Sequence, residues 1–249
     1  MRQFRSTAER CNYLGLDRPD LQFAINEVCR EMCSPTQGSQ KRLQRIGQYL
    51  KSHRRVVWIF DLQDPVNVID VYGDANWAAC RRTRKNTKGG CPLRGQHCLK
   101  TWAKTQALVA KSNAESELYT LVRASCEALG AQTLMAELGE KVKVRVHVDA
   151  TAAKAIAERS GLDKLRHVDV NILWIQEQEA RDRLPLVKVC GKINPADLMT
   201  KYVDGELIKR HLKSMSTDFR EGRAQLAAQL YGVAQRRGGR KTRRRRTMS

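Results

Sequence analysis

The chain has 249 residues, of which 46 are lysine or arginine and 26 are aspartate or glutamate, giving a formal net charge of +20. This excess favours a polyanionic partner, because lysine and arginine neutralise phosphates and release counterions, and nucleic acid is the first candidate. No stretch approaches the ~20 apolar residues of a membrane-spanning helix, and no signal peptide opens the sequence. We therefore expect neither a membrane partner nor secretion.

The eight cysteines show no regular spacing, and without a secretory route a disulfide framework is not expected. Cys91, His97 and Cys98 are close in sequence and are residue types that bind zinc. No second Cys-x-x-Cys or His-x-x-x-His pair completes a set of four ligands, so we expect reduced thiols and no zinc site.

Residues 1–64 are predicted to be mostly helical. Leu21, Ile25 and Val28 recur at helical spacing after Arg18-Pro19-Asp20, which is typical of a helix start. A second helix is predicted from Gly38 to Ser52, with its apolar residues on one face. The basic residues on its other faces are either contacts for a nucleic-acid backbone or a solvated surface, and the sequence leaves both open.

Residues 65–203 are predicted to form one α/β domain. Short β-like runs at 66–73, 87–93 and 96–102 predict an antiparallel meander. A long helix is predicted next, and after it residues 142–148 alternate with the period of a half-buried strand. The ranges expected for the other helices and strand are 114–138, 150–159, 167–181, 184–190 and 195–203. This order predicts a mixed five-stranded sheet with flanking helices.

Residues 204–249 are predicted to form a polar helix followed by an arginine-rich tail. Like charges repel along Arg236–Arg246, and nothing there can form a core, so we expect this tail to be disordered alone. It is either a nucleic-acid contact, a nuclear import signal or simply a solvated tail.

Four acidic residues stand where predicted strands end or helices begin: Asp74, Glu117, Asp149 and Asp197. Hard oxygen ligands from separate elements suit Mg²⁺, which keeps several waters and is completed by substrate phosphate. Position alone also allows Asp149 and Asp197 to be helix N-caps. Asp70, within a strand, and Asp169, near a helix start, are expected to be structural.

Several motifs occur in one order along the chain. They are Tyr72-Gly73-Asp74-Ala75-Asn76-Trp77-Ala78, Thr83 to Gly90, Trp102 with Gln106, Lys111 to Leu118, Val148-Asp149, Arg166 to Val170 and Asn194 to Lys201. Together they resemble the ribonuclease H domain that ends the Pol polyprotein of copia-type long-terminal-repeat retrotransposons. Residues 1–64 resemble the segment that links the polymerase to this domain, through Tyr13-Leu14, Arg18-Pro19-Asp20 and Tyr49-Leu50-Lys51. The polymerase motif is absent, so the chain resembles the C-terminal part of a longer Pol.

This resemblance implies a ribonuclease H-like fold and a metal-dependent endonuclease that cleaves the RNA strand of RNA–DNA hybrids during reverse transcription. It implies that Asp74, Glu117, Asp149 and Asp197 bind two Mg²⁺ ions, which Mn²⁺ could replace, with Asp74 bridging them. Glu115 is a rival for the role of Glu117, two residues away and therefore on another helix face. Many cellular ribonucleases H carry a histidine before the last acid, whereas Gly191-Lys192-Ile193 fills that loop here. His167 is expected to be structural rather than its substitute.

Substrate contacts are expected from basic and polar residues beside the first and third strands. Phosphate contacts position a duplex, and hydrogen bonds to 2′-hydroxyls in the minor groove identify the RNA strand. The predicted residues are Arg81, Arg82, Arg84, Lys85, Lys88, Lys104, Gln106 and Asn113, with Gln106 and Asn113 as 2′-hydroxyl contacts. Trp77 and Trp102 are expected to be scaffold aromatics.

Two other functions remain open at this stage. One is a catalytically inactive, retrotransposon-derived remnant that binds nucleic acid. The other is a transposase or integrase with a similar arrangement of acids, which the later motifs fit poorly. The resemblance implies an RNA–DNA hybrid and the polymerase portion of the same Pol as partners. It also implies a cytoplasmic location in virus-like particles, and the arginine-rich tail adds the nucleus as a second location.

Overall fold

The structure is a computed structural model that describes residues 1–77, 80, 83–161 and 169–224. At its N-terminus, helices α1 (Arg2–Leu14), α2 (Pro19–Cys29) and α3 (Gln37–Ser52) pack on one another. As the sequence predicts, Pro19 is at the first position of α2, where its missing N–H leaves no helical hydrogen bond unmade. Thr36 and Ser39 form a capping box that fixes the start of α3.

The central sheet contains strands β2 (Val68–Asn76), β3 (Thr87–Arg94), β4 (His97–Cys98), β5 (Trp102–Thr105), β6 (Lys143–Val148) and β7 (Leu186–Lys188). Strand β2 is antiparallel to β3 and parallel to β6, and β6 is parallel to β7. The sheet is therefore mixed, as predicted, with the order β4-β3-β2-β6-β7 and β5 on the same side of β3 as β4.

The predicted third strand, 96–102, was wrong in its extent. The chain pairs with β3 twice, first through the short β4 and then through β5, and residues between them leave the ladder. The two pieces occupy one strand position, so six strands fill the five positions that the sequence predicts. Strand β2 also runs beyond Gly73, which places Asp74 inside a strand rather than after it.

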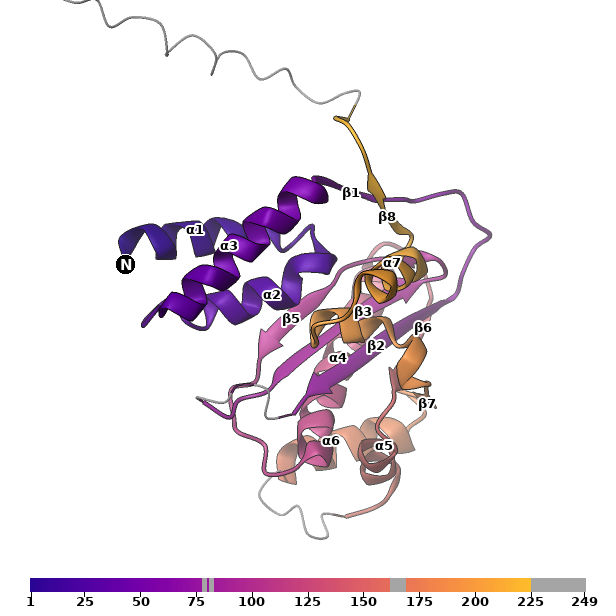
Figure 1. Ribbon diagram of the computed structural model, residues 1–249. Coiled ribbons are helices and arrows are strands. Elements are labelled where there is room, and N and C mark those ends of the chain that lie inside the picture. Colours follow the sequence, from indigo (N-terminus) through magenta and orange to yellow (C-terminus); the bar gives the residue numbers. More distant parts are fainter. Residues whose placement is uncertain (78–79, 81–82, 162–168, 225–249) are drawn as a thin grey trace, which may run out of the picture.

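Figure 1 shows the two faces of this sheet covered by different elements. Helix α4 (Asn113–Glu137) lies on one face, with α5 (Thr151–Glu158) and α6 (Asp169–Ala180) packed around it. Its buried Leu118 and Leu121 join Ile69 and Val71 of the sheet in the main core. The short 3₁₀ helix η3 (Pro195–Met199) and helix α7 (Gly205–Ser214) cover the other face, preceded by η2 (Gly191–Ile193).

Two predictions near the C-terminus need correction. The helix expected at 195–203 is only the 3₁₀ helix η3, and the strand expected at 184–190 is limited to β7. The polar helix expected after residue 204 is α7. The sequence did not predict a two-stranded sheet in which β1 (Arg55–Trp58) pairs with β8 (Thr217–Arg220). The segments that precede and follow the central sheet in sequence therefore pair with each other. The Arg236–Arg246 tail and His167 lie outside the described residues.

Candidate metal centre

Asp74 lies in the middle of the sheet, on the face that η3 covers. Its side chain is buried, with the residue 1% exposed. Its cross-strand partner is Gly89, where an added Cβ would lie 2.6 Å from Cβ of Met199 and 2.9 Å from Cγ2 of Thr200. Only glycine therefore lets η3 and the residue after it lie directly on β3, beside Asp74.

Three aspartates meet at this point. Asp149 follows the end of β6, the parallel neighbour of β2, and Asp197 lies in η3. One carboxylate oxygen from each of Asp74, Asp149 and Asp197 lies within 4.8 Å of the others. The structure thus brings together three of the four predicted acids, from two neighbouring strands and the 3₁₀ helix above them.

Glu117 approaches the same cluster from α4. This helix comes close to β2 because Gly73 has no side chain; an added Cβ there would be 3.3 Å from both Thr120 Cγ2 and Ala124 Cβ. Glu117 lies on the same helix face as Thr120 and Ala124, at spacings of three and seven residues. It lies outside the 4.8 Å group, yet it is only 8% exposed and feels the charges of Asp74 and Asp149.

Glu115, the rival of Glu117, is engaged elsewhere. It is 2% exposed, and its carboxylate accepts a hydrogen bond of 2.7 Å from the backbone N–H of Lys111. This contact closes the turn before α4, where an acidic group also favours the helix dipole. Glu115 therefore stabilises the start of the helix, whereas Glu117 is directed to the aspartates.

Burial and mutual repulsion raise the pKa values of these acids. Burial, followed by the charges of Asp74 and Asp149, raises the pKa of Glu117 to about 9. Burial also raises the pKa of Asp74 to about 7, with Asp197 and Asp149 adding to the effect against the opposing charge of Lys201. The pKa of Asp149 is raised as well, again chiefly by burial. Crowded, desolvated carboxylates of this kind require a cation or protons.

Lys201 supplies a cation that the sequence analysis did not assign to the site. Its Nζ lies 2.8 Å from Asp197 Oδ1 and 3.3 Å from Asp74 Oδ1. These carboxylates raise its pKa above the ordinary value, against the opposing effect of burial. Thr200 donates a hydrogen bond from its hydroxyl to Asp74 Oδ2. The signal was present in the spacing, because Lys201 follows Asp197 by four residues within a matched motif.

The donor set fits a hard divalent cation. It consists of carboxylate oxygens from three segments far apart in sequence, with no sulfur or imidazole ligand in the described cluster. Oxygen ligands are those that Mg²⁺ and Mn²⁺ prefer. Gly191 of η2 lies next to the cluster, and an added Cβ there would be 3.1 Å from Asp149 Oδ2. The absence of a side chain at Gly191 therefore lets η2 pack against Asp149.

The residues predicted to contact nucleic acid have different environments. Arg81 and Arg82 lie outside the described residues. Exposed positions are held by Arg84, Lys104 and Asn113, and partly buried ones by Lys85 and Lys88. Gln106 requires a correction: it is 2% exposed, and its amide donates to the carbonyl oxygen of Ser116 at 3.0 Å. Its Oε1 accepts from Asn86 Nδ2 at 3.2 Å, so Gln106 ties the loop before α4 to the loop before β3.

The mixed sheet has the ribonuclease H-like fold that the sequence predicts, and the buried acidic cluster lies beside it. No family model matches the chain. It is 33% identical over 124 residues to an uncharacterized mitochondrial protein of Arabidopsis thaliana, which covers 50% of this chain. It is 25% identical over 202 residues to the retrovirus-related Pol polyprotein from transposon RE1 of Arabidopsis thaliana, which covers 80% of this chain. It is 27% identical over 188 residues to the corresponding polyprotein from transposon TNT 1-94 of Nicotiana tabacum, which covers 75% of it.

The chain is thus a homologue of the retrovirus-related Pol polyproteins of transposons, and the resemblance seen in the motifs is confirmed. It spans 51% of the mitochondrial relative and 14% of each of the two polyproteins. Among solved structures, LC11-RNase H1 from compost covers 59% of the chain at 17% identity and a TM-score of 0.43, the chain covering 99% of it. A prototype foamy virus protease-reverse transcriptase covers 52% at 14% identity and a TM-score of 0.33, with 18% of its own chain covered. These likenesses are weak, and the fold is identified by its own strand order and register.

In the described part of the chain, no helix combines the length and the apolar character needed to cross a bilayer.

Proposed function

We propose that the chain is the ribonuclease H part of a transposon Pol and cleaves the RNA strand of RNA–DNA hybrids with two divalent cations, Mg²⁺ or in its place Mn²⁺. The observation that carries this proposal is the convergence of Asp74, Asp149 and Asp197 within 4.8 Å. The raised pKa of Glu117, caused by burial and by two of these aspartates, supports its place as the fourth acid.

In this proposal, Asp74 would be a ligand of both cations, Glu117 and Asp149 would bind beside it, and Asp197 would complete the second site. Two such ions would supply a nucleophilic hydroxide and stabilise the leaving oxygen of a phosphodiester. The buried sheet holds Asp74 in place, and Thr200 orients one of its oxygens. In the metal-free chain Lys201 neutralises Asp74 and Asp197, and cations bound at the same oxygens would displace its ammonium.

The partner in this proposal is an RNA–DNA hybrid, delivered by the polymerase portion of the same Pol. The formal net charge of +20 supports it, since each phosphate contact by a lysine or arginine releases counterions. Exposed Arg84 and Lys104 are suited to backbone contacts, and exposed Asn113 to a 2′-hydroxyl. We propose a location in cytoplasmic virus-like particles, with the arginine-rich tail giving access to the nucleus.

Cleavage of a labelled hybrid tests the proposal. The purified chain should cut the RNA strand with Mg²⁺ and stop when EDTA is added. Glu117→Gln should reduce cleavage to background, whereas Glu115→Gln, the matched control two residues away, should retain it. If the unchanged chain cuts no hybrid with either Mg²⁺ or Mn²⁺, the proposed activity is wrong.

One observation favours the second candidate, a remnant that binds nucleic acid without turnover. The Lys201 ammonium ion-pairs with both Asp74 and Asp197 and so competes with a cation for the same oxygens. If this pairing prevails, hybrid binding should weaken steeply with salt while no product forms. Lys201→Met tests this competition, because it removes the ammonium and should lower the Mg²⁺ concentration at which the cluster is half-saturated. Product formation by the unchanged chain decides between the two candidates.

A further inference from the structure

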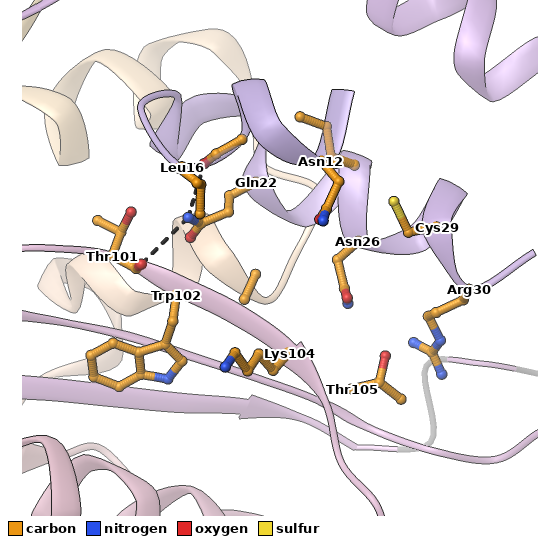
Figure 2. Close-up of a pocket in the computed structure, with 13 residues that line it drawn as sticks. Asn12, Leu16, Gln22, Asn26, Cys29, Arg30, Thr101, Trp102, Lys104 and Thr105 are labelled. Atoms are coloured by element: carbon orange, nitrogen blue, oxygen red, sulfur yellow. Dashed lines mark hydrogen bonds between the residues drawn. The ribbon is translucent and has the colours of Figure 1, made fainter. Parts of the chain in front are cut away.

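A second site lies between the N-terminal helices and the edge of the sheet. The cavity there has a volume of about 550 Å³ and is lined by α1, α2, the turn between them and β5. Figure 2 shows Gln22 and Asn26 reaching from α2 toward the strand that carries Trp102, Lys104 and Thr105. Neither the acids of the metal centre nor Lys201 line it. A cavity of this size is typical of small-molecule sites.

Four polar atoms around this cavity are buried without a hydrogen-bond partner in the described part of the protein. They are Gln22 Oε1, Asn26 Nδ2, Thr101 Oγ1 and Trp102 Nε1. Gln22 is 8% exposed and Trp102 is 4% exposed, so neither residue is freely hydrated. Gln22 uses its Nε2 to donate to the carbonyl oxygens of Gly15 at 3.0 Å and Thr101 at 3.4 Å, which leaves its Oε1 available.

Unpaired buried polar groups are unfavourable unless something satisfies them. Asn26 Nδ2 and Trp102 Nε1 are donors, Gln22 Oε1 is an acceptor, and Thr101 Oγ1 can be either. Four such atoms around one cavity indicate a ligand that carries both acceptors and donors. Ordered water is the alternative occupant, and the binding test below distinguishes the two.

Positive charge gathers beside the same cavity. Lys104 lines it and is exposed, and Lys104 is the cross-strand partner of Lys88. Arg123 of α4 is close enough to Lys88 that, after burial, its charge and that of Lys104 lower the pKa of Lys88. Only Arg123 has a carboxylate partner among these three in the described structure, namely Glu127. An anion beside Lys104 would relieve this repulsion.

We propose that this cavity binds one nucleotide of a single-stranded nucleic acid, with the base against Gln22, Asn26 and Thr101 and a phosphate on Lys104. The edge of a base offers adjacent donors and acceptors, and side-chain amides are their natural partners. A peptide segment would match the donors and acceptors as well, but it would leave the lysines without a counter-charge. The inference is independent of the metal centre, so it does not require cleavage.

The test measures binding in EDTA, where no cleavage can occur. The probe is a fluorescein-labelled 12-nucleotide single-stranded DNA of mixed sequence, and its anisotropy is followed at several salt concentrations. Asn26→Leu removes the amide at similar volume and should weaken binding about five-fold without changing the salt dependence. Lys104→Gln should weaken binding and reduce the slope of log affinity against log salt by about 0.7, the value for one phosphate contact on a single strand.

Lys141→Gln is the matched control, since Lys141 is equally exposed but lies beyond the far end of α4. It removes the same charge and should change neither quantity by a comparable amount. Thr101→Val, which removes only a hydroxyl, is a second variant if Asn26→Leu fails to fold by circular dichroism. The proposal is overturned if Lys104→Gln behaves like Lys141→Gln, or if the two amide and hydroxyl variants bind as the unchanged chain does. Loss of hybrid cleavage in a separate Mg²⁺ assay would count against the nuclease and not against this site.

Discussion

Replacing Asp74 by asparagine should stabilise the metal-free chain while it abolishes cleavage. Burial and the neighbouring aspartates raise the pKa of Asp74 from its ordinary 3.8 to about 7. The folded state therefore holds a proton that the unfolded chain releases above pH 4, and stability falls as pH rises toward 7. Asparagine is neutral at every pH and does not suffer this loss.

The size of the effect follows from the two pKa values. With 1.36 kcal/mol for each unit of difference, ionisation of Asp74 lowers stability by about 4 kcal/mol at pH 8 and by about 2 kcal/mol at pH 5. The gain from Asp74→Asn should therefore be larger at pH 8. Both are upper values, because asparagine offers Thr200 and Lys201 one oxygen instead of a carboxylate.

Urea unfolding in EDTA at the two pH values measures this difference directly. Addition of Mg²⁺ should stabilise the unchanged chain, because a ligand that binds only the folded state shifts the equilibrium toward it. Mg²⁺ should have little effect on Asp74→Asn. If the variant is less stable than the unchanged chain in EDTA at pH 8, the carboxylates are not crowded, and the geometry of the metal centre is wrong.

Three further predictions concern the scaffold around the site. Asp70 is partly buried, which would raise its pKa, yet hydrogen bonds from His147 and Arg145 lower its pKa to about 2. The stabilisation by its carboxylate is therefore present above pH 4 and lost as pH falls through 2. Asp70→Asn should cost about 2 kcal/mol at pH 7 in urea unfolding and nothing near pH 2. Gly90→Ala should destabilise the fold by more than about 2 kcal/mol, because the added Cβ would lie 2.2 Å from the carbonyl oxygen of Tyr72 and 2.3 Å from Trp102. Gly130→Ala in α4, where an added Cβ would meet nothing within 4 Å, should stabilise the fold by about 0.5–1 kcal/mol. Equal melting temperatures for the two variants would contradict this packing. Thr36→Ala should lower stability by about 1 kcal/mol through loss of the capping box, and an unchanged denaturation midpoint would show that the start of α3 is held by other contacts.

The sequence by itself located most of the local elements and selected the four acids as candidate ligands. Helical spacing located α2 and α4, and alternation located β6, because these patterns reflect which face of one element is buried. The motif around Asn194–Lys201 favoured Asp197 as a candidate metal ligand over its interpretation as a helix cap. Family resemblance favoured Glu117 over Glu115. Local spacing is sufficient here because each signal lies within one helix or strand.

Tertiary structure alone decided how these pieces meet. Gly89 matters because Met199, more than a hundred residues later, lies where its side chain would be, and this contact brings η3 to Asp74. Lys201 reaches Asp74 and Gln106 turns inward to Asn86 for the same reason, because these partners belong to other segments of the fold. The β1–β8 pair and the cavity beside β5 also depend on segments that no local periodicity connects. Long-range proximity is set by packing of the whole chain, and a single sequence encodes it only indirectly.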